Sequence, residues 1–458
     1  MSPAPPSSLS SLSSARVDEL LADLARHDAA ARPPAHEPST HAPVHVVYGG
    51  AHLYRADNAA KLGTIARAAM DTWGTDDREF AKLVGLASAD LASELASRVR
   101  EKLAREPVEK TCIDFEDGYG PRPDEEEDTD AIRAATELAS ANRPARPIVG
   151  IRIKALAPVT ARRALRTLDL FLTTLARKTA GVVPDGFTVT LPKVSQPYEV
   201  AMLADVIAAL ERLLGIASSS ARIGIELMVE TPRALLDGEG RVALPALVTA
   251  AGGRCVAAHL GAYDLTASLG VTAGQQRLDH PACDAARMLM QLSLAGTGVE
   301  VVDGATTLLP IARHRETPGA PLTAAQRAIN ASDVHAAWAL HATAVRRALA
   351  QGIYQGWDLH PAQLPARYGA VYAFFLEERL AMTARLRSFV AKATQATRSG
   401  QVFDDAATGQ GLLELFVRGV ACGAFTAEDV QETGLTIDEM RARSFAAILA
   451  TRARQADA

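Results

Sequence analysis

Eight short apolar runs, separated by longer helical stretches, constrain the fold of this chain more than any other feature. Most of the runs show no strict alternation of apolar and polar residues, a pattern typical of strands buried on both faces of a parallel sheet. Eight strand–helix units in succession predict an α/β protein with a closed (β/α)8 TIM barrel, and an open doubly wound sheet is the alternative. The runs are Val44–Tyr48, Thr111–Phe115, Ile148–Ile153, Gly186–Leu191, Arg222–Val229, Cys255–Leu260, Gly298–Val302 and Gly352–Leu359.

The segments that flank the runs differ from them in composition. Residues 1–42 are rich in Ser, Ala, Pro and His and form an N-terminal extension, in which we expect a helix over 15–31. The barrel is expected to span residues 43–366, and residues 367–458 are predicted to be a C-terminal helical region. The helices expected in that region are Val371–Arg398, Gly409–Cys422 and Thr426–Arg452.

Helical patterns also fill the connections between the runs. The connection 305–351 is too long for one plain crossover, so it is expected to hold a loop, Pro310–Pro321, and then a helix. Ser332 is a suitable N-cap for that helix, which should end at Gln351 because Gly352 follows. Other expected helices are Asp57–Met70, Val159–Ala176 and Pro197–Leu214.

Composition excludes several classes of function. The 458 residues carry a mild net charge of −5, which gives no reason to expect nucleic acid or an anionic membrane as a partner. No apolar run approaches the ~20 residues that span a bilayer, and residues 1–14 lack the apolar stretch of a secretory signal. The cysteines form no Cys-x-x-Cys pair, so we expect neither a zinc site nor disulfides, and a cytoplasmic location. They are Cys112, Cys255, Cys283 and Cys422.

Charged residues gather where the predicted strands end. In a (β/α)8 barrel these carboxyl ends meet on one face, and active sites lie there. No equivalent cluster marks the starts of the strands. The residues concerned are Asp114, Glu116, Asp117, Arg152, Lys154, Lys193, Glu230, Asp264, Asp303, Asp358 and His360.

This set of side chains suits the chemistry of an oxo-acid. Mg²⁺ takes oxygen ligands, usually one or two carboxylates together with waters and substrate oxygens. Two carboxylates from neighbouring strands leave open positions for a bidentate oxo- or hydroxy-acid, whose enolate the metal stabilises. An arginine can hold a carboxylate or oxyanion in two parallel hydrogen bonds, and a further acid or base moves the proton.

Seven motifs carry a resemblance to a known superfamily. In this order, one at each strand end, they are similar to those of citrate lyase β-subunits, malyl-CoA lyases and HpcH/HpaI aldolases, with malate synthase as a more distant relative. The resemblance covers about residues 44–375. The motifs are Asp-Phe-Glu-Asp-Gly at 114–118, Ile-Arg-Ile at 151–153, Leu-Pro-Lys-Val at 191–194, Val-Glu-Thr-Pro at 229–232, Gly-x-x-Asp-Leu at 261–265, Val-Asp-Gly at 302–304 and Leu-His-Pro-x-Gln at 359–363.

The resemblance implies a phosphoenolpyruvate/pyruvate-type barrel enzyme that makes or breaks a carbon–carbon bond in a small oxo- or hydroxy-acid. Its implied cofactor is Mg²⁺, which Mn²⁺ could replace, and its implied assembly is a homo-oligomer. Glu230 and Asp264 match the two metal-binding carboxylates. Arg152 matches the arginine that faces the substrate carboxylate and the developing enolate, although it could instead form a structural ion pair with Asp114.

The strand-two motif and a nearby lysine complete the implied catalytic set. Asp114, Glu116 and Asp117 match the acidic motif that lines the metal site, partly through water. Lys193 matches a lysine near that motif. Asp117, which precedes Gly118, could instead belong only to a turn.

Other candidate residues have both a functional and a structural interpretation. His52 follows the first strand and would lie on the active rim, where it could contact the substrate. Asp303, Asp358 and His360 are candidate substrate-binding residues. Asp303 could instead brace the loop after it, and His360 could cap the barrel floor or donate to a backbone carbonyl. Glu226 should share the side of the strand on which Glu230 lies, and a buried glutamate there needs a partner, for which Arg152, Lys154 and Lys193 are candidates.

The chain departs from the superfamily pattern at three places. Tyr263 replaces a common glutamate, and the stretch before His360 lacks a common lysine and contains Asp358. The expected loop after the second strand carries five acidic residues at 124–128, which would repel the phosphates of coenzyme A if they face the metal. A CoA thioester and a free oxo-acid are therefore equally open as the substrate.

Two other classes of function are alternatives to a lyase. One is a non-catalytic or complex-dependent subunit that only binds an oxo-acid. Binding alone needs fewer charged groups at the rim, so the full set of carboxylates and arginine disfavours this class. The other is a phosphoenolpyruvate-type phosphotransferase. The sequence has no glycine-rich phosphate loop and no separate nucleotide-binding domain, which disfavours the second class.

Overall fold

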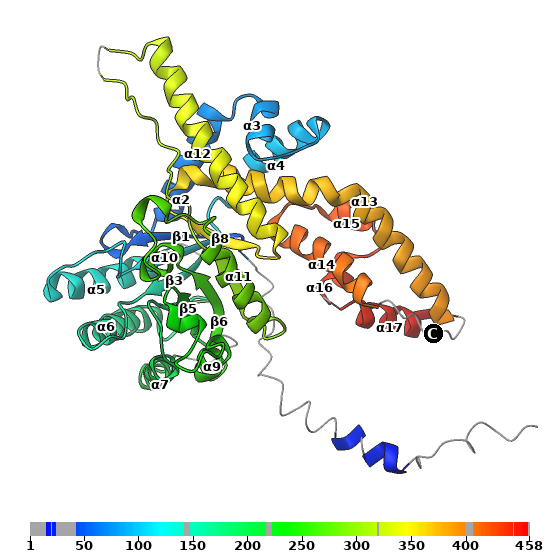
Figure 1. The fold of residues 1–458 in the computed structure, drawn as a ribbon, viewed down its shortest axis with the longest axis horizontal. Helices are drawn as coiled ribbons and strands as arrows, with labels where there is room; N and C mark the ends of the chain where they lie inside the picture. The colour runs from blue at the N-terminus through cyan, green and yellow to red at the C-terminus, as the bar shows by residue number, and fades with distance from the viewer. Residues whose placement is uncertain are drawn as a thin grey trace, which may run out of the picture.

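Eight parallel strands form a closed barrel in the computed structural model (Figure 1), which describes residues 15–19, 21–23, 43–141, 147–216, 222–317, 320–398, 406–442 and 444–456. Each strand pairs with the next one along the chain, and the last pairs with the first. The predicted TIM barrel is confirmed, and the open sheet is excluded. The strands are β1 His45–Gly50, β2 Lys110–Asp114, β3 Ile148–Arg152, β4 Thr188–Leu191, β5 Gly224–Val229, β6 Cys255–Leu260, β7 Glu300–Asp303 and β8 Gln355–Asp358.

Helices fill the connections between strands, as the periodic patterns predicted. Short 3-10 turns follow β1 and β8, at Ala51–Leu53 and Pro361–Gln363, and two more lie at Ala89–Leu91 and Ala273–Gln275. The helices of this part are α2 Asn58–Trp73, α3 Asp77–Leu83, α4 Ala92–Arg105, α5 Asp124–Ser140, α6 Ala161–Thr179, α7 Pro197–Leu213, α8 Pro232–Leu235, α9 Leu244–Ala250, α10 Ala262–Ser268, α11 Pro281–Leu294 and α12 Ala324–Ala350.

The long helix before β8 begins earlier than Ser332, where the sequence placed its start. Its N-cap is Thr323, whose hydroxyl accepts from the backbone N–H of Gln326 while the Gln326 side chain accepts from that of Thr323. This reciprocal capping box satisfies backbone donors of the first turn, so the helix begins at Ala324. It stops before Gly352, as predicted, because Gly352 has a left-handed φ of +78°.

The C-terminal region is helical, but its last predicted helix is broken into three. Thr426–Arg452 was expected to be one helix, whereas Gly434 has a left-handed φ of +80° and Thr436 caps a new helix. Of the predicted N-terminal helix, 15–19 and 21–23 are helical, and the rest lies outside the described residues. The C-terminal helices are α13 Leu364–Arg398, α14 Ala406–Cys422, α15 Ala427–Gln431, α16 Ile437–Arg441 and α17 Phe445–Ala456, and they lie to one side of the barrel (Figure 1).

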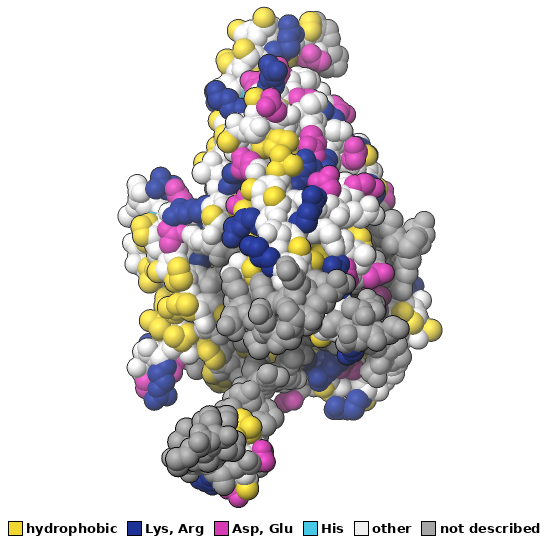
Figure 2. Space-filling view, turned by 90° about the vertical axis from the view of Figure 1, so that its right-hand side faces the viewer, with side chains coloured by type: hydrophobic (Ala, Val, Ile, Leu, Met, Phe, Trp, Pro, Cys, Tyr) yellow, Lys and Arg dark blue, Asp and Glu magenta, His cyan; other side chains and the backbone are white. Residues whose placement is uncertain are grey.

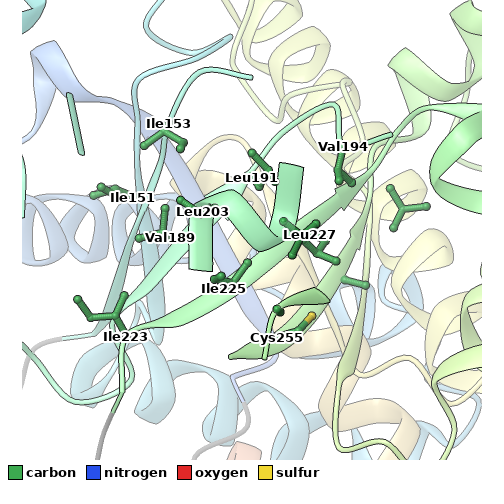
Figure 3. Close-up of a cluster of buried hydrophobic side chains, with 14 of the residues drawn as sticks. Ile151, Ile153, Val189, Leu191, Val194, Leu203, Ile223, Ile225, Leu227 and Cys255 are labelled. Atoms are coloured by element: carbon green, nitrogen blue, oxygen red, sulfur yellow. The ribbon is translucent and has the colours of Figure 1, made fainter. Parts of the chain in front are cut away.

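Two apolar cores hold these parts together. The first lies between the strands and the helices around them, where Ile151, Val189 and Leu227 are fully buried (Figure 3). The second joins α2–α4 and α12 to the C-terminal helices around Trp338 and Phe416. Because apolar strand residues face outward into the first core, the inward positions are left free for polar side chains.

On the face shown in Figure 2, the described residues form no large patch of charges of one sign. Basic and acidic side chains are interspersed there over the described residues, with apolar ones between them. Within the described part of the chain, no helix combines the length and the apolarity needed to cross a membrane.

Candidate active site

A buried ionic group fills the barrel below its C-terminal rim. Glu226 of β5 forms an ion pair with Lys110 of β2 and accepts a 2.9 Å hydrogen bond from the Thr190 hydroxyl, and His259 Nε2 lies 3.4 Å from it. Burial alone would raise the pKa of Glu226, but the charges of Lys110 and His259 hold it well below its usual value. Glu226 therefore has the partner that the sequence required, although Lys110 was not among the candidates.

Asp114 and Arg152 form a two-pronged ion pair at the ends of β2 and β3. Arg152 donates from Nε and Nη2 to the two oxygens of Asp114, at 2.7 and 2.5 Å. The backbone N–H groups of Glu116 and Gly118 donate to the same oxygens, at 2.9 and 2.7 Å. Two of the guanidinium nitrogens of Arg152 thus bind Asp114. The third, Nη1, lies 3.3 Å from Glu116 and 3.6 Å from Asp117 in the turn that follows β2.

Lys193 links the strand-two acids to Glu230. It adopts a left-handed φ of +51°, which is uncommon for a residue with a side chain. Its backbone N–H donates to Glu230 Oε1 at 2.6 Å, while its ammonium forms an ion pair with Glu116 and lies 3.3 Å from Asp117. Burial lowers the pKa of Lys193, but the hydrogen bond and charge of Glu116 outweigh burial and raise it, so the ammonium stays charged.

Glu230 and Asp264 lie at the ends of the neighbouring strands β5 and β6. Glu230 directly follows β5 and is 2% exposed, whereas Asp264 is exposed in the first turn of α10. Burial raises the pKa of Glu230, Lys193 lowers it, and the charge of Asp264 raises it, to about 7 in all. Two carboxylates that repel each other in this way form a site that a cation would stabilise.

The donor set at Glu230 fits a magnesium ion. A Cβ atom at Gly261 would lie 2.6 Å from Glu230 Oε2, so the bare glycine backbone leaves room for that carboxylate. Among the described residues no group of three or more His, Cys, Asp or Glu side chains could enclose a metal. Two carboxylates suit Mg²⁺, which keeps waters and substrate oxygens in its remaining positions. Glu230 and Asp264 are the residues that would hold it.

Asp303 and Asp358 do not join this set. Arg287 of α11 donates to Asp303 from Nε at 2.8 Å, and Asp358 is fully buried between Arg367 of α13 and His341 of α12, at 3.0 and 2.9 Å. Successive strand residues point to opposite sides, and both aspartates point outward to the helices. Substrate contact, predicted for both, does not fit these positions.

The two predicted histidines differ in their surroundings. His360 Nδ1 accepts from the backbone N–H of Ala362 at 3.1 Å and so caps the turn after β8, at the C-terminal rim and not at the barrel floor. His52 lies after β1 with its ring 5.7 Å from that of Tyr119. Its buried Nδ1 has no hydrogen-bond partner among the described residues, so His52 remains a candidate for substrate contact.

The acidic stretch 124–128 is the start of helix α5 and not a loop. Negative charge is favourable in the first turn of a helix, and basic residues neutralise most of it. Glu127 is fully buried and accepts from Lys154 at 2.7 Å, and Asp128 pairs with Arg163 at 2.6 Å. The repulsion of coenzyme A that the sequence suggested therefore loses its physical basis.

Two aromatic residues near Arg152 were not predicted from the sequence as part of the site. The Arg152 guanidinium carbon lies 5.1 Å from the centre of the Tyr48 ring and 6.0 Å from that of Trp357. The two rings stack with their centres 4.4 Å apart, and Trp357 Nε1 donates to His259 Nδ1 at 2.8 Å. The alternation of β8 was the available signal, because one of Trp357 and Asp358 had to face inward.

These features define a (β/α)8-barrel protein with a compact set of carboxylates, arginine and lysine at its C-terminal rim. The chain belongs to the family described as a domain of unknown function, DUF6986, which matches residues 24–448. A comparison with curated proteins gives no match.

Solved structures resemble this fold at low sequence identity. A citrate lyase from Burkholderia xenovorans LB400 is 19% identical, with a TM-score of 0.50 over 74% of this chain and 92% of its own. A malate synthase magnesium/glyoxylate complex from Haloferax volcanii is 14% identical, with a TM-score of 0.44 over 72% and 76%. An HpcH/HpaI aldolase/citrate lyase family protein from Burkholderia cenocepacia J2315 is 13% identical, with a TM-score of 0.36 over 70% and 89%. The likeness to the citrate lyase shows the fold that the sequence motifs implied.

Proposed function

We propose that this protein is a Mg²⁺-dependent carbon–carbon lyase, aldolase or condensing enzyme that acts on a small oxo- or hydroxy-acid through an enolate. The observation that carries the proposal is the buried carboxylate of Glu230, placed beside Asp264 at neighbouring strand ends and against the bare backbone of Gly261. The resemblance of the sequence motifs supports a metal-binding role for the two carboxylates.

The charged residues around Glu230 and Asp264 would have separate roles in such a reaction. When bound, a divalent ion supplies Lewis acidity to the oxygen atoms of a 2-oxo acid. Arg152 contributes a fixed positive charge, which stabilises negative charge that develops on the substrate. Asp114 positions that guanidinium through its two hydrogen bonds, so it acts on the substrate through Arg152.

Glu116 is the group best placed to move a proton. It is mostly buried, and burial raises its pKa although the charge of Arg152 lowers it. A carboxyl group with a raised pKa exchanges protons more readily near neutral pH than an ordinary one. In the proposed reaction a Glu116 oxygen takes a proton from the carbon next to the carbonyl, and Lys193 holds that oxygen in place.

The proposal covers a free acid and its CoA thioester equally. Glu127 and Asp128 are paired with basic residues, so the start of α5 gives no reason to exclude coenzyme A.

Calorimetric titration with Mg²⁺ tests the proposed metal site. The unaltered protein should bind the ion, while Glu230→Gln and Asp264→Asn should each lose most of the affinity and still melt cooperatively. The matched control is Asp205→Asn, which removes an exposed carboxylate on the outer helix α7 and should leave Mg²⁺ affinity unchanged. Unchanged affinity in both site variants would contradict the proposal.

A further inference from the structure

The rings of Tyr48 and Trp357 form an aromatic platform inside the barrel. Tyr48 comes from β1 and Trp357 from β8, yet the rings contact Arg152 of β3 and His259 of β6. Residues of non-adjacent strands meet only across the interior of a barrel, so both rings point inward. Their centres lie 4.4 Å apart with an angle of 28° between the planes.

The platform is the uppermost layer on its side of the barrel. Tyr48 and Trp357 are partly exposed residues, with the Tyr48 hydroxyl buried, whereas Thr190, Glu226 and His259 are fully buried. Trp357 is the penultimate residue of β8, and Arg152, which lies over both rings, ends β3. Solvent and ligands therefore reach the platform from the C-terminal rim, and the ionic group around Glu226 is closed to them.

The platform faces the proposed metal carboxylates across the mouth of the barrel. The strands run in order from β1 to β8 around the closed barrel, so β8 and β1 lie opposite β5, the strand that Glu230 follows. An acid held by its first two carbons near Glu230 and Asp264 can extend its remaining carbons over the two rings.

Charge at this side of the mouth disfavours a second carboxylate on the ligand. Among the described residues that point into the barrel or end its strands on this rim, Lys110, Arg152 and Lys193 are each already paired with carboxylates. The faces of aromatic rings carry partial negative charge. A second carboxylate over the platform would have to compete with Asp114 and Glu116 for the paired cations there, whereas an apolar chain would be removed from water.

We propose that this site takes a monocarboxylic 2-oxo- or 2-hydroxy-acid whose apolar side chain packs on the aromatic platform of Tyr48 and Trp357. This inference rests on the proposed function, because Glu230 and Asp264 must hold the metal that binds the oxygens of the acid. It adds the class of side chain that the substrate carries.

Two hydroxy-acids of nearly the same shape test the inference. Malate and 2-hydroxy-4-methylpentanoate share a carboxylate, a hydroxyl and a CH₂ group, and they differ in ending with a carboxylate or an isopropyl group. In calorimetric titrations with saturating Mg²⁺, the isopropyl acid should bind at least about tenfold more tightly, as expected for burial of two methyl groups. Trp357→Ala should bring the ratio of the two dissociation constants toward one, while Trp357→Phe, which retains a ring, should keep most of it.

The outcomes separate this inference from the function on which it rests. Mg²⁺-dependent binding of malate that is equal to or tighter than that of the isopropyl acid would overturn the platform assignment and still support the metal site. Preference for the isopropyl acid that survives Trp357→Ala would also overturn the platform assignment. If the affinity for both acids is the same with and without Mg²⁺ and is unchanged by Glu230→Gln, the proposed function itself would be overturned.

Discussion

Replacing Glu230 with Gln should stabilise the metal-free protein while it abolishes Mg²⁺ binding. Burial raises the pKa of Glu230, and the charge of Asp264 adds to this effect against the opposing charge of Lys193, so that the pKa reaches about 7. A rise from the usual 4.5 to about 7 corresponds to about 3 kcal/mol of lost stability once the carboxyl group is charged. Gln carries no charge and keeps an oxygen for the Lys193 N–H.

The sign of this effect depends on pH. Between pH 4.5 and about 7 the folded protein retains a proton on Glu230 that the unfolded chain has released, so the free energy of unfolding falls as pH rises. Below this window both states hold the proton and the penalty is absent. Glu230→Gln should therefore raise the free energy of unfolding by about 3 kcal/mol at about pH 8 and by little at about pH 5.

Urea unfolding, followed by circular dichroism at both pH values with and without Mg²⁺, measures the effect. Mg²⁺ should stabilise the unaltered protein and not the variant. The matched control is Glu226→Gln, which leaves Lys110 without its buried partner and should cost about 3–5 kcal/mol at both pH values. A Glu230→Gln protein that is less stable than the unaltered one at about pH 8 would show that the buried Glu230 carboxylate does not destabilise the metal-free fold.

Three other predictions follow from pairings in the structure. Arg152→Lys should lower kcat at least roughly a hundredfold and also lower Tm, because Asp114 loses its fork; kcat per folded molecule that is unchanged would refute a catalytic role. Asp358→Asn should cost about 3 kcal/mol in urea unfolding at neutral pH and leave Mg²⁺ affinity intact. Burial raises the pKa of Asp358 but Arg367 holds it below its usual value, so this cost should begin to decline only as pH falls below about 4, the ordinary pKa of an aspartate. Asp128→Ser should not change coenzyme A affinity in calorimetry, whereas a tenfold gain would show that this carboxylate does repel coenzyme A.

The fold could be predicted from the sequence because short apolar runs alternate with helical patterns along the barrel part of the chain. Each run coincides with a strand, with ends that differ by a few residues. The start of α12 could also have been predicted, since Thr323 and Gln326 have the spacing of a capping box. Ser332, which was chosen instead, has His335 at that spacing and cannot form the box.

The candidate site could be predicted only in part from the sequence. Position after a strand end correctly indicated that Glu230, Asp264 and Arg152 would share one rim. It did not indicate on which side of its strand Asp358 would point, because Asp358 and Trp357 are adjacent and only one of them faces inward. The pairing of Lys110 with Glu226 could not be deduced either, since it depends on which strands face each other across the closed barrel.

Exchange of the carbon-bound hydrogens of pyruvate is a direct test of whether the protein forms a metal-dependent enolate. An enzyme that forms an enolate of a 2-oxo acid should replace the methyl hydrogens of pyruvate with deuterium in heavy water, without a second substrate, and proton NMR follows the loss of the methyl signal. We expect exchange with Mg²⁺ that is abolished by EDTA and by Glu230→Gln. Exchange that persists in EDTA, or its absence in Mg²⁺-bound protein, would contradict it.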